Sequence, residues 1–286
     1  MDFAVHRYRS ACGRLDLAAR LYPGAGPTLL LMHGLTRNSA DFAPLAERLV
    51  GRYRMVVPDQ RGRGLSQWDP ETTNYRPDVY AHDMFALLES LGIARTAVIG
   101  TSMGGLIAMV MNAIRPDVVG PVIFNDVGPV LEAEGLTRIQ GYVGPSQAMA
   151  NWDEAAAHCR AINGAALPYL DEAGWHDFAR RTCIEQADGT ILFAYDPAIA
   201  QGVAGSAPST VPPDLWPLWD MLDTKPALVI RGERSDLLAR KTVDEMRGRH
   251  AGPFATAEVP QAGHAPILNE PVALDAIDRF LQEHVA

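Results

Sequence analysis

The chain has 286 residues, of which 48% are hydrophobic and 21% charged, a composition typical of a globular protein with one large core. Its formal charge of −9 argues against nucleic-acid binding, because that affinity depends on neutralising phosphates with positive charge. The longest apolar stretches are too short to cross a bilayer, and the first residues lack the pattern of a signal peptide. The 3 cysteines have no metal-ligand spacing and indicate free thiols, so we expect a cytoplasmic protein.

Strands and helices are predicted to alternate along the first part of the chain. An antiparallel hairpin is expected over 3–22, where two apolar stretches flank a glycine turn. The strands expected after it lie at 28–32, 53–57, 96–99 and 118–125, with helices at 40–50, 80–91 and 106–114 between them. Such alternation is typical of a parallel sheet with crossover helices.

From residue 128 the alternation stops. Residues 128–215 contain helical segments but no stretch with the two-residue period of a strand, which predicts an inserted, mostly helical module. Alternation resumes with strands at 227–231 and 254–259 and helices at 241–249 and 274–281. We therefore expect an α/β core domain made of residues 1–127 and 216–286, with the module at 128–215 inserted into it.

The strand at 96–99 runs into the sequence Gly100-x-Ser102-x-Gly104, the pattern of a nucleophile elbow. A serine at such a sharp strand-to-helix turn sits in strained backbone, and a Cβ at either flanking glycine would clash. The helix that follows offers free N–H groups where an oxyanion would form. The pattern therefore predicts Ser102 as a nucleophile.

Two later loops supply an acid and a histidine. Asp236 follows the strand at 227–231, and His264 follows the last strand, in the chain order typical of α/β-hydrolase triads. Asp126, directly after the strand at 118–125, is an alternative acid. We favour Asp236, because its strand, its turn and its distance before His264 match the commoner position of the triad acid in α/β-hydrolases.

The chain resembles α/β-hydrolase fold-1 enzymes of the type with a helical cap. The resemblance rests on His33 with Gly34, on residues 59–66 (DQRGRGLS), on the elbow, and on the loops of Asp236 and His264. These motifs span nearly the whole chain. They imply an α/β fold whose mostly parallel eight-stranded sheet is flanked by helices.

The resemblance also implies roles for individual residues. Ser102 would be the nucleophile, His264 the general base and then the general acid, and Asp236 the residue that orients the imidazole. The backbone N–H groups of Leu35 and Met103 would form the oxyanion hole. Because serine at the elbow favours acyl chemistry, the predicted substrate is a small-molecule carboxylic ester or lactone.

Two other functions stay open: a carbon–carbon bond hydrolase of a vinylogous diketone with the same triad, and a catalytically silent small-molecule binder. No pair of histidines has the spacing of metal ligands, so we expect neither a metal nor a cofactor. The oligomeric state is not predicted. The residues predicted to contact the substrate are Arg37, Arg138, Tyr142 and Trp152.

Overall fold

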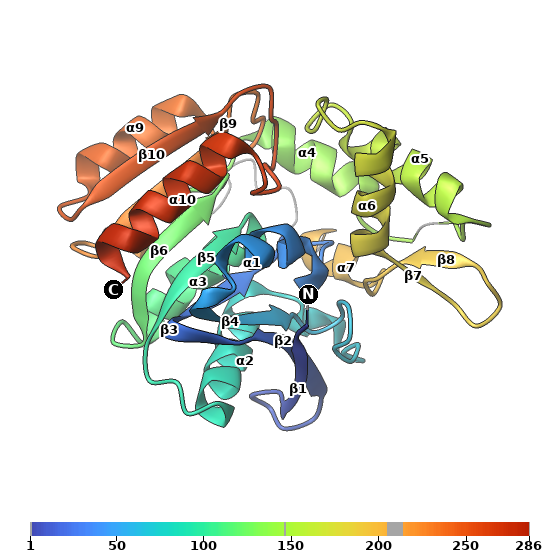
Figure 1. Cartoon of the computed structure of the whole chain (residues 1–286), viewed down its shortest axis with the longest axis horizontal. Coiled ribbons are helices and arrows are strands. Elements are labelled where there is room, and N and C mark those ends of the chain that lie inside the picture. The colour runs from blue at the N-terminus through green and yellow to red at the C-terminus, as the bar shows by residue number, and fades with distance from the viewer. Residues whose placement is uncertain (1, 146, 205–213, 286) are drawn as a thin grey trace.

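The computed structural model describes residues 2–145, 147–204 and 214–285, and it is built around an eight-stranded sheet with the order β1-β2-β4-β3-β5-β6-β9-β10 (Figure 1). Its strands are β1 (Ala4–Arg9), β2 (Asp16–Tyr22), β3 (Gly24–Met32), β4 (Gly51–Asp59), β5 (Thr96–Thr101), β6 (Val119–Asn125), β9 (Ala227–Gly232) and β10 (Phe254–Val259). The pairs β1/β2 and β2/β4 are antiparallel, and every other pair is parallel. The predicted mostly parallel α/β sheet of eight strands is confirmed.

Helices cover both faces of this sheet. Helices α2, α3, α8 and α9 pack on one face, and α1 and α10 pack on the other. Their bounds, with those of two short 3-10 helices, are η1 (Ser39–Phe42), α1 (Ala43–Leu49), η2 (Thr72–Asn74), α2 (Pro77–Ser90), α3 (Met103–Ile114), α8 (Trp216–Asp220), α9 (Arg240–Arg249) and α10 (Pro271–His284). None of the helices in the described parts of the chain is long and apolar enough to span a membrane.

The central strand β3 shows why these residues form a sheet covered on both sides. Leu30 and Met32 enter the core beneath α2 and α3, whereas Leu29 and Leu31 enter the core beneath α1 and α10. Successive strand residues point to opposite faces, so a strand buried on both faces needs an unbroken apolar run. The carboxyl ends of the parallel strands lie at one edge, where binding sites of α/β sheets assemble.

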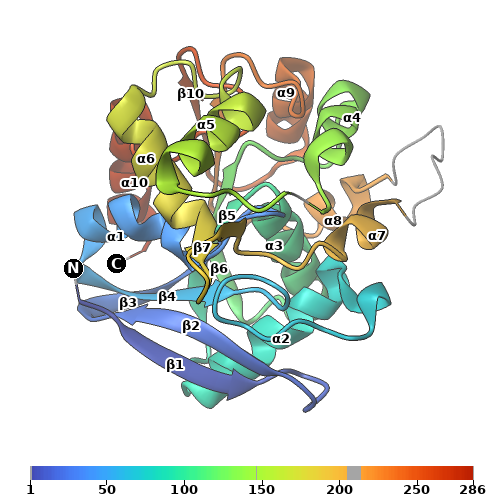
Figure 2. The same cartoon turned by 90° about the vertical axis from the view of Figure 1, so that its right-hand side faces the viewer.

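The chain between β6 and α8 forms a separate group of elements at this edge (Figure 2). These are α4 (Ala133–Tyr142), α5 (Trp152–Asn163), α6 (Glu172–Thr182), β7 (Cys183–Glu185), β8 (Ile191–Phe193) and α7 (Ile199–Ala204). The expectation that this segment holds no strand was wrong, because β7 and β8 form an antiparallel hairpin. With three residues in each strand, the hairpin is too short for a two-residue period to stand out in the sequence.

The same segment has a small apolar core of its own, formed by side chains of α5, α6 and the hairpin. Cys159, Trp175 and Phe178 are among its buried members. Part of the expected insertion, residues 205–213, lies outside the described residues. The described part brings α4, α5 and α6 over the edge of the sheet where β5 and β6 end.

Candidate active site

The turn between β5 and α3 holds Ser102 in a left-handed backbone conformation, with φ of 51°. That conformation strains any residue with a side chain, and it points the serine out of the sheet. A Cβ on Gly100 would lie 2.5 Å from the backbone carbon of Gly104, and a Cβ on Gly104 would lie 2.1 Å from the Met32 carbonyl oxygen. The glycines of the elbow pattern are therefore required by the close approach of strand and helix.

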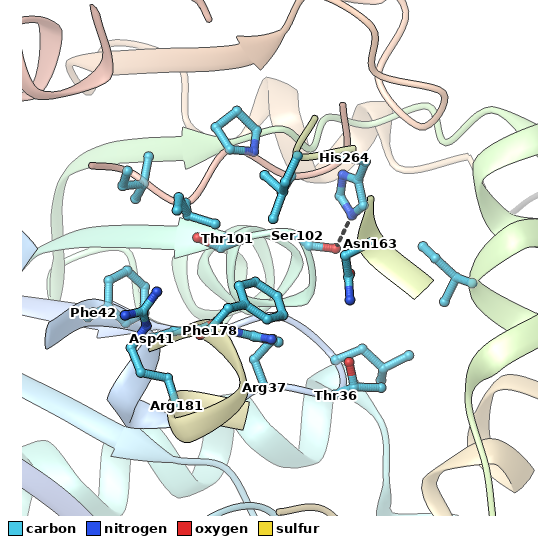
Figure 3. Close-up of a pocket in the computed structure, with 18 of the residues that line it drawn as sticks. Thr36, Arg37, Asp41, Phe42, Thr101, Ser102, Asn163, Phe178, Arg181 and His264 are labelled. Carbon is cyan, nitrogen blue, oxygen red and sulfur yellow. Dashed lines mark hydrogen bonds and ion pairs between the residues drawn. The ribbon is translucent and has the colours of Figure 1, made fainter. Parts of the chain in front are cut away.

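Three side chains from separate loops form a continuous row of hydrogen bonds. The Oγ of Ser102 lies 2.9 Å from Nε2 of His264 (Figure 3), and Nδ1 of His264 lies 2.8 Å from Oδ2 of Asp126. Ser102 follows β5, Asp126 follows β6, and His264 follows β10, so the sheet edge gathers all three. Because the serine contacts the histidine and the histidine contacts the carboxylate, the geometry allows a proton to pass from the serine hydroxyl to the imidazole.

Asp126 is wholly buried and its carboxylate is fully occupied. Its Oδ1 accepts the backbone N–H of Gly232 at 2.8 Å, and its Oδ2 accepts the hydroxyl of Ser235 at 2.6 Å as well as the imidazole of His264. A buried carboxylate is costly unless donors surround it. These donors hold the carboxylate in one orientation against the imidazole.

Asp236 was expected to orient the imidazole of His264, and the structure corrects this. In the described parts of the chain, Asp236 makes no hydrogen bond to His264. Asp236 instead accepts two hydrogen bonds from Arg138, at 2.5 and 2.9 Å. Its backbone carbonyl accepts the N–H of Gly135 in the first turn of α4. Burial raises the pKa of the Asp236 carboxyl, but the hydrogen bonds and charge of Arg138 outweigh burial and leave the pKa below its ordinary value.

Strand order explains this exchange of roles. Strand β6 lies directly beside β5, so the residue after β6 emerges next to the elbow. The Ser102 N–H donates to the Asn125 carbonyl at 2.9 Å, which joins the ends of the two strands. Strand β9 lies one position further out, and its loop reaches the site through Ser235, one residue before Asp236. Asp236 therefore anchors α4 rather than the imidazole.

The backbone amides of Leu35 and Met103 have no hydrogen-bond acceptor in the described parts of the chain. Leu35 lines the cavity beside Ser102, and Met103 is the first residue of α3. Within 2–145, 147–204 and 214–285, neither amide donates a hydrogen bond to backbone or side chain. Both are thus available to an oxygen at the carbon attacked by Ser102, as an oxyanion hole requires.

His33 organises the loop that carries Leu35. Its Nε2 accepts the Gln60 N–H at 3.1 Å, which leaves Nδ1 to donate to the Gly34 carbonyl at 2.7 Å. The ring is fully buried, and burial lowers the pKa of His33 to about 4. His33 is therefore a neutral part of the loop at physiological pH and is not available as the base.

Arg63, from the sequence DQRGRGLS, supports the same loop from below. Its Nε donates to the Leu35 carbonyl at 2.9 Å, its Nη1 to the Tyr80 hydroxyl at 2.8 Å, and its Nη2 lies 3.8 Å from the Met103 sulfur. The side chain is completely buried, and no carboxylate of the described residues pairs with it. One buried cation thus contacts both residues predicted to form the oxyanion hole.

A cavity of about 90 Å³ opens beside Ser102 and His264. Its walls come from the Leu35 loop, from α4, α5 and α6, and from the loop after His264. Phe42 and Phe178 supply part of its apolar surface (Figure 3). In the described ranges, no group of three or more His, Cys, Asp or Glu side chains could hold a metal ion.

Of the four residues predicted to contact a substrate, Arg37 and Tyr142 line this cavity. Arg138 does not line it, because the side chain is paired with Asp236. Trp152 also lies elsewhere: its Nε1 is 3.2 Å from Oε2 of Glu185. The structure therefore does not bring these two side chains to the cavity. A helix presents several faces, and only packing decides which one meets the cavity.

Sequence reasoning missed other cavity residues, among them Asp41, Asn163 and Arg181. Asp41 lies in η1, Asn163 ends α5, and Arg181 lies in the last turn of α6. Nothing in their local sequence distinguishes them from solvent-facing helix residues. Ser235, which donates to Asp126, stands beside the predicted acid and is found only through its contact.

Comparison with known proteins agrees with the fold. A sequence model described as "alpha/beta hydrolase fold" matches residues 27–271. The 3-hydroxybutyrate-oligomer hydrolase of Cupriavidus necator is 34% identical over 90% of this chain and 89% of its own length. The 2-(acetamidomethylene)succinate hydrolase of Mesorhizobium japonicum is 31% identical, over 94% and 92%. A crystal structure of an alpha/beta hydrolase from Novosphingobium aromaticivorans is 39% identical, with a TM-score of 0.90 over 98% of both chains.

Proposed function

This chain belongs to the α/β-hydrolase family, and we propose that it is a serine hydrolase that cleaves a small carboxylic ester or lactone through an acyl-enzyme intermediate. The observation that carries the proposal is the row of hydrogen bonds from Ser102 through His264 to Asp126 beside a small cavity. A serine hydroxyl is unreactive until a neighbouring base takes its proton, and this row supplies the base.

In the acylation step, Ser102 Oγ attacks the carbonyl carbon of the substrate while Nε2 of His264 takes the hydroxyl proton. Asp126 fixes the proton on Nδ1 and stabilises the imidazolium that forms. The tetrahedral intermediate then collapses. The leaving alcohol departs with the proton from Nε2, and the acyl group stays on Ser102.

In the deacylation step, a water molecule takes the place of the alcohol. His264 removes one of its protons as the water oxygen attacks the acyl carbon, and Nε2 returns that proton to Ser102 Oγ when the ester bond breaks. The carboxylic acid is released, and the enzyme returns to its starting state.

During both steps, negative charge develops on the carbonyl oxygen. The amides of Leu35 and Met103 are the donors that we assign to it, because both are without acceptors in the described chain. Removing one oxyanion donor costs about 10²–10³ in rate in enzymes of this kind. Arg63 holds the Leu35 loop and contacts the Met103 side chain, so we assign it the role of fixing the two donors relative to each other.

The segment between β6 and α8, predicted as a cap at 128–215, is assigned the role of enclosing the substrate. Its helices α4, α5 and α6 contribute Tyr142, Asn163 and Phe178 to the cavity wall. A partly enclosed cavity of about 90 Å³ favours a short substrate. The free thiols of the 3 cysteines support placing the enzyme in the cytoplasm.

The similarity to a 3-hydroxybutyrate-oligomer hydrolase supports ester cleavage, because hydroxy acids join through ester bonds. The test is turnover of p-nitrophenyl acetate and butyrate, of γ-butyrolactone, and of a vinylogous diketone by the purified enzyme and by Ser102→Ala. We expect the esters or the lactone to be hydrolysed and the variant to be inactive. Turnover of the diketone alone would assign carbon–carbon bond cleavage, and equal ester turnover by Ser102→Ala would contradict the nucleophile.

A further inference from the structure

The cavity beside Ser102 is lined by two guanidinium groups, those of Arg37 and Arg181. Figure 3 shows both grouped with Asp41, across the cavity from His264. Arg37 comes from the loop after β3, and Arg181 comes from the last turn of α6. The two cations thus reach one space from opposite parts of the fold.

Arg37 makes three hydrogen bonds to protein side chains. Its Nε donates to Oδ2 of Asp41 at 2.7 Å, its Nη2 also binds that carboxylate, and its Nη1 donates to the Thr182 hydroxyl. Its guanidinium lies 3.8 Å from the centre of the Phe178 ring. A group held by a carboxylate, a hydroxyl and an aromatic face has little capacity left for a ligand.

Arg181 is the opposite case. Across the described parts of the chain, its side chain makes no hydrogen bond and no ion pair. Of the described cavity-lining residues, Asp41 alone carries a carboxylate, and that carboxylate is already bound by Arg37. Burial lowers the pKa of Arg181, because desolvation disfavours the charged form. Asp41 and Asp177 favour its charge only from a distance. The described cavity wall therefore carries one guanidinium that no carboxylate binds.

Such a charge is costly to hold at a partly enclosed site and is offset when an anion binds. The planar guanidinium matches a carboxylate in shape and forms paired, charge-assisted hydrogen bonds with it. We propose that Arg181 is a substrate-binding residue that receives a carboxylate, so that the substrate is a short ester bearing a free carboxylate away from the scissile bond. This inference rests on the proposed ester hydrolysis at Ser102, and it names the substrate class of that same site.

The test uses probe pairs that differ only in this charge. One pair is 3-acetoxybutanoate and 3-acetoxybutanamide, followed by release of acetate; the other is methyl hydrogen glutarate and methyl glutaramate, followed by release of methanol. The first pair carries the carboxylate on the alcohol side and the second on the acyl side. We expect the wild-type enzyme to prefer the carboxylate member of at least one pair in kcat/KM.

In Arg181→Gln, this preference should fall by about 10–100-fold, the equivalent of one lost charge-assisted interaction. Turnover of the amide member should fall less than turnover of the carboxylate member, and Arg181→Lys should keep part of the preference. Arg180→Gln is the matched control, because Arg180 is the neighbouring arginine of α6 and lies 4.3 Å over the Trp152 ring. It should leave both members unchanged.

Equal turnover of both members by the wild-type enzyme, or an equal loss of both in Arg181→Gln, would overturn the inference. Thermal melting followed by circular dichroism reports whether Arg181→Gln folds. If it does not fold, the preference of the wild-type enzyme and the behaviour of Arg181→Lys decide the question. Failure of the proposed function has a different signature, since no member of either pair would then be hydrolysed at Ser102.

Discussion

Replacing Asp126 by asparagine should remove most of the activity while leaving the site in place. The Asp126 carboxylate accepts from three donors, and the one that matters for chemistry is Nδ1 of His264 at 2.8 Å. An asparagine NH₂ at that position turns the imidazole to the tautomer with its proton on Nε2, which then faces Ser102. Such a histidine cannot accept the serine proton, and in a serine triad this exchange costs about 10⁴ in kcat.

The matched control is Asp236→Asn, which breaks the ion pair with Arg138 but leaves the row of hydrogen bonds intact. We expect its kcat toward p-nitrophenyl acetate to stay within a few-fold of the wild-type value. Its free energy of unfolding should fall by about 1–2 kcal/mol, since the pair is partly buried. The reasoning is refuted if Asp126→Asn, folded by circular dichroism, keeps wild-type turnover while Asp236→Asn loses it.

Three further changes test the surroundings of the site. Gly104→Ala should lower the free energy of unfolding in urea by about 2–3 kcal/mol, because its Cβ would lie 2.1 Å from the Met32 carbonyl oxygen, whereas Gly141→Ala in open space on α4 should be neutral or stabilising. The pKa of His33 is about 4 in the folded protein against an ordinary 6.5, so the unfolded chain binds a proton first as pH falls. The contribution of neutral His33 to the free energy of unfolding is complete above pH 6.5 and should decline by about 3 kcal/mol towards pH 4. His33→Gln should remove this part of the pH dependence of stability. Arg63→Met should lower kcat about 10-fold or more with a smaller change in KM, because the Leu35 carbonyl loses its donor. Arg63→Lys should recover part of kcat. An effect on KM alone would argue against a role of Arg63 in holding the oxyanion loop.

Much of the fold and part of the candidate site could be predicted because they depend on local patterns. The glycines around Ser102 are demanded by backbone contacts within the turn itself, so the pattern carries its own physical reason. The apolar run before His33 and the alternation of strands and helices likewise reflect burial on both faces of the sheet. His264 could be placed because it follows the last strand and therefore reaches the same edge.

The choice of acid and the identity of the cavity residues depend on contacts between distant segments. Asp126 and Asp236 both follow strands of the same sheet, and local sequence ranks them poorly. What separates them is an arginine on α4, 98 positions before Asp236, and the neighbouring Ser235, which binds Asp126. Arg181 differs from Arg37, the other arginine of the described cavity wall, in having no carboxylate bound to it. The carboxylate there, that of Asp41, is bound by Arg37. No local pattern encodes such an absence.

The central claim is that Ser102 is a nucleophile activated by His264, and covalent labelling tests it most directly. The folded enzyme is treated with an alkyl fluorophosphonate and its intact mass is measured, followed by peptide mapping. We predict one adduct per chain, on the peptide that contains Ser102, formed quickly by the wild-type enzyme and not at all by Ser102→Ala. His264→Ala should be labelled far more slowly. An unlabelled wild-type protein, or an adduct on any other residue, would contradict the account.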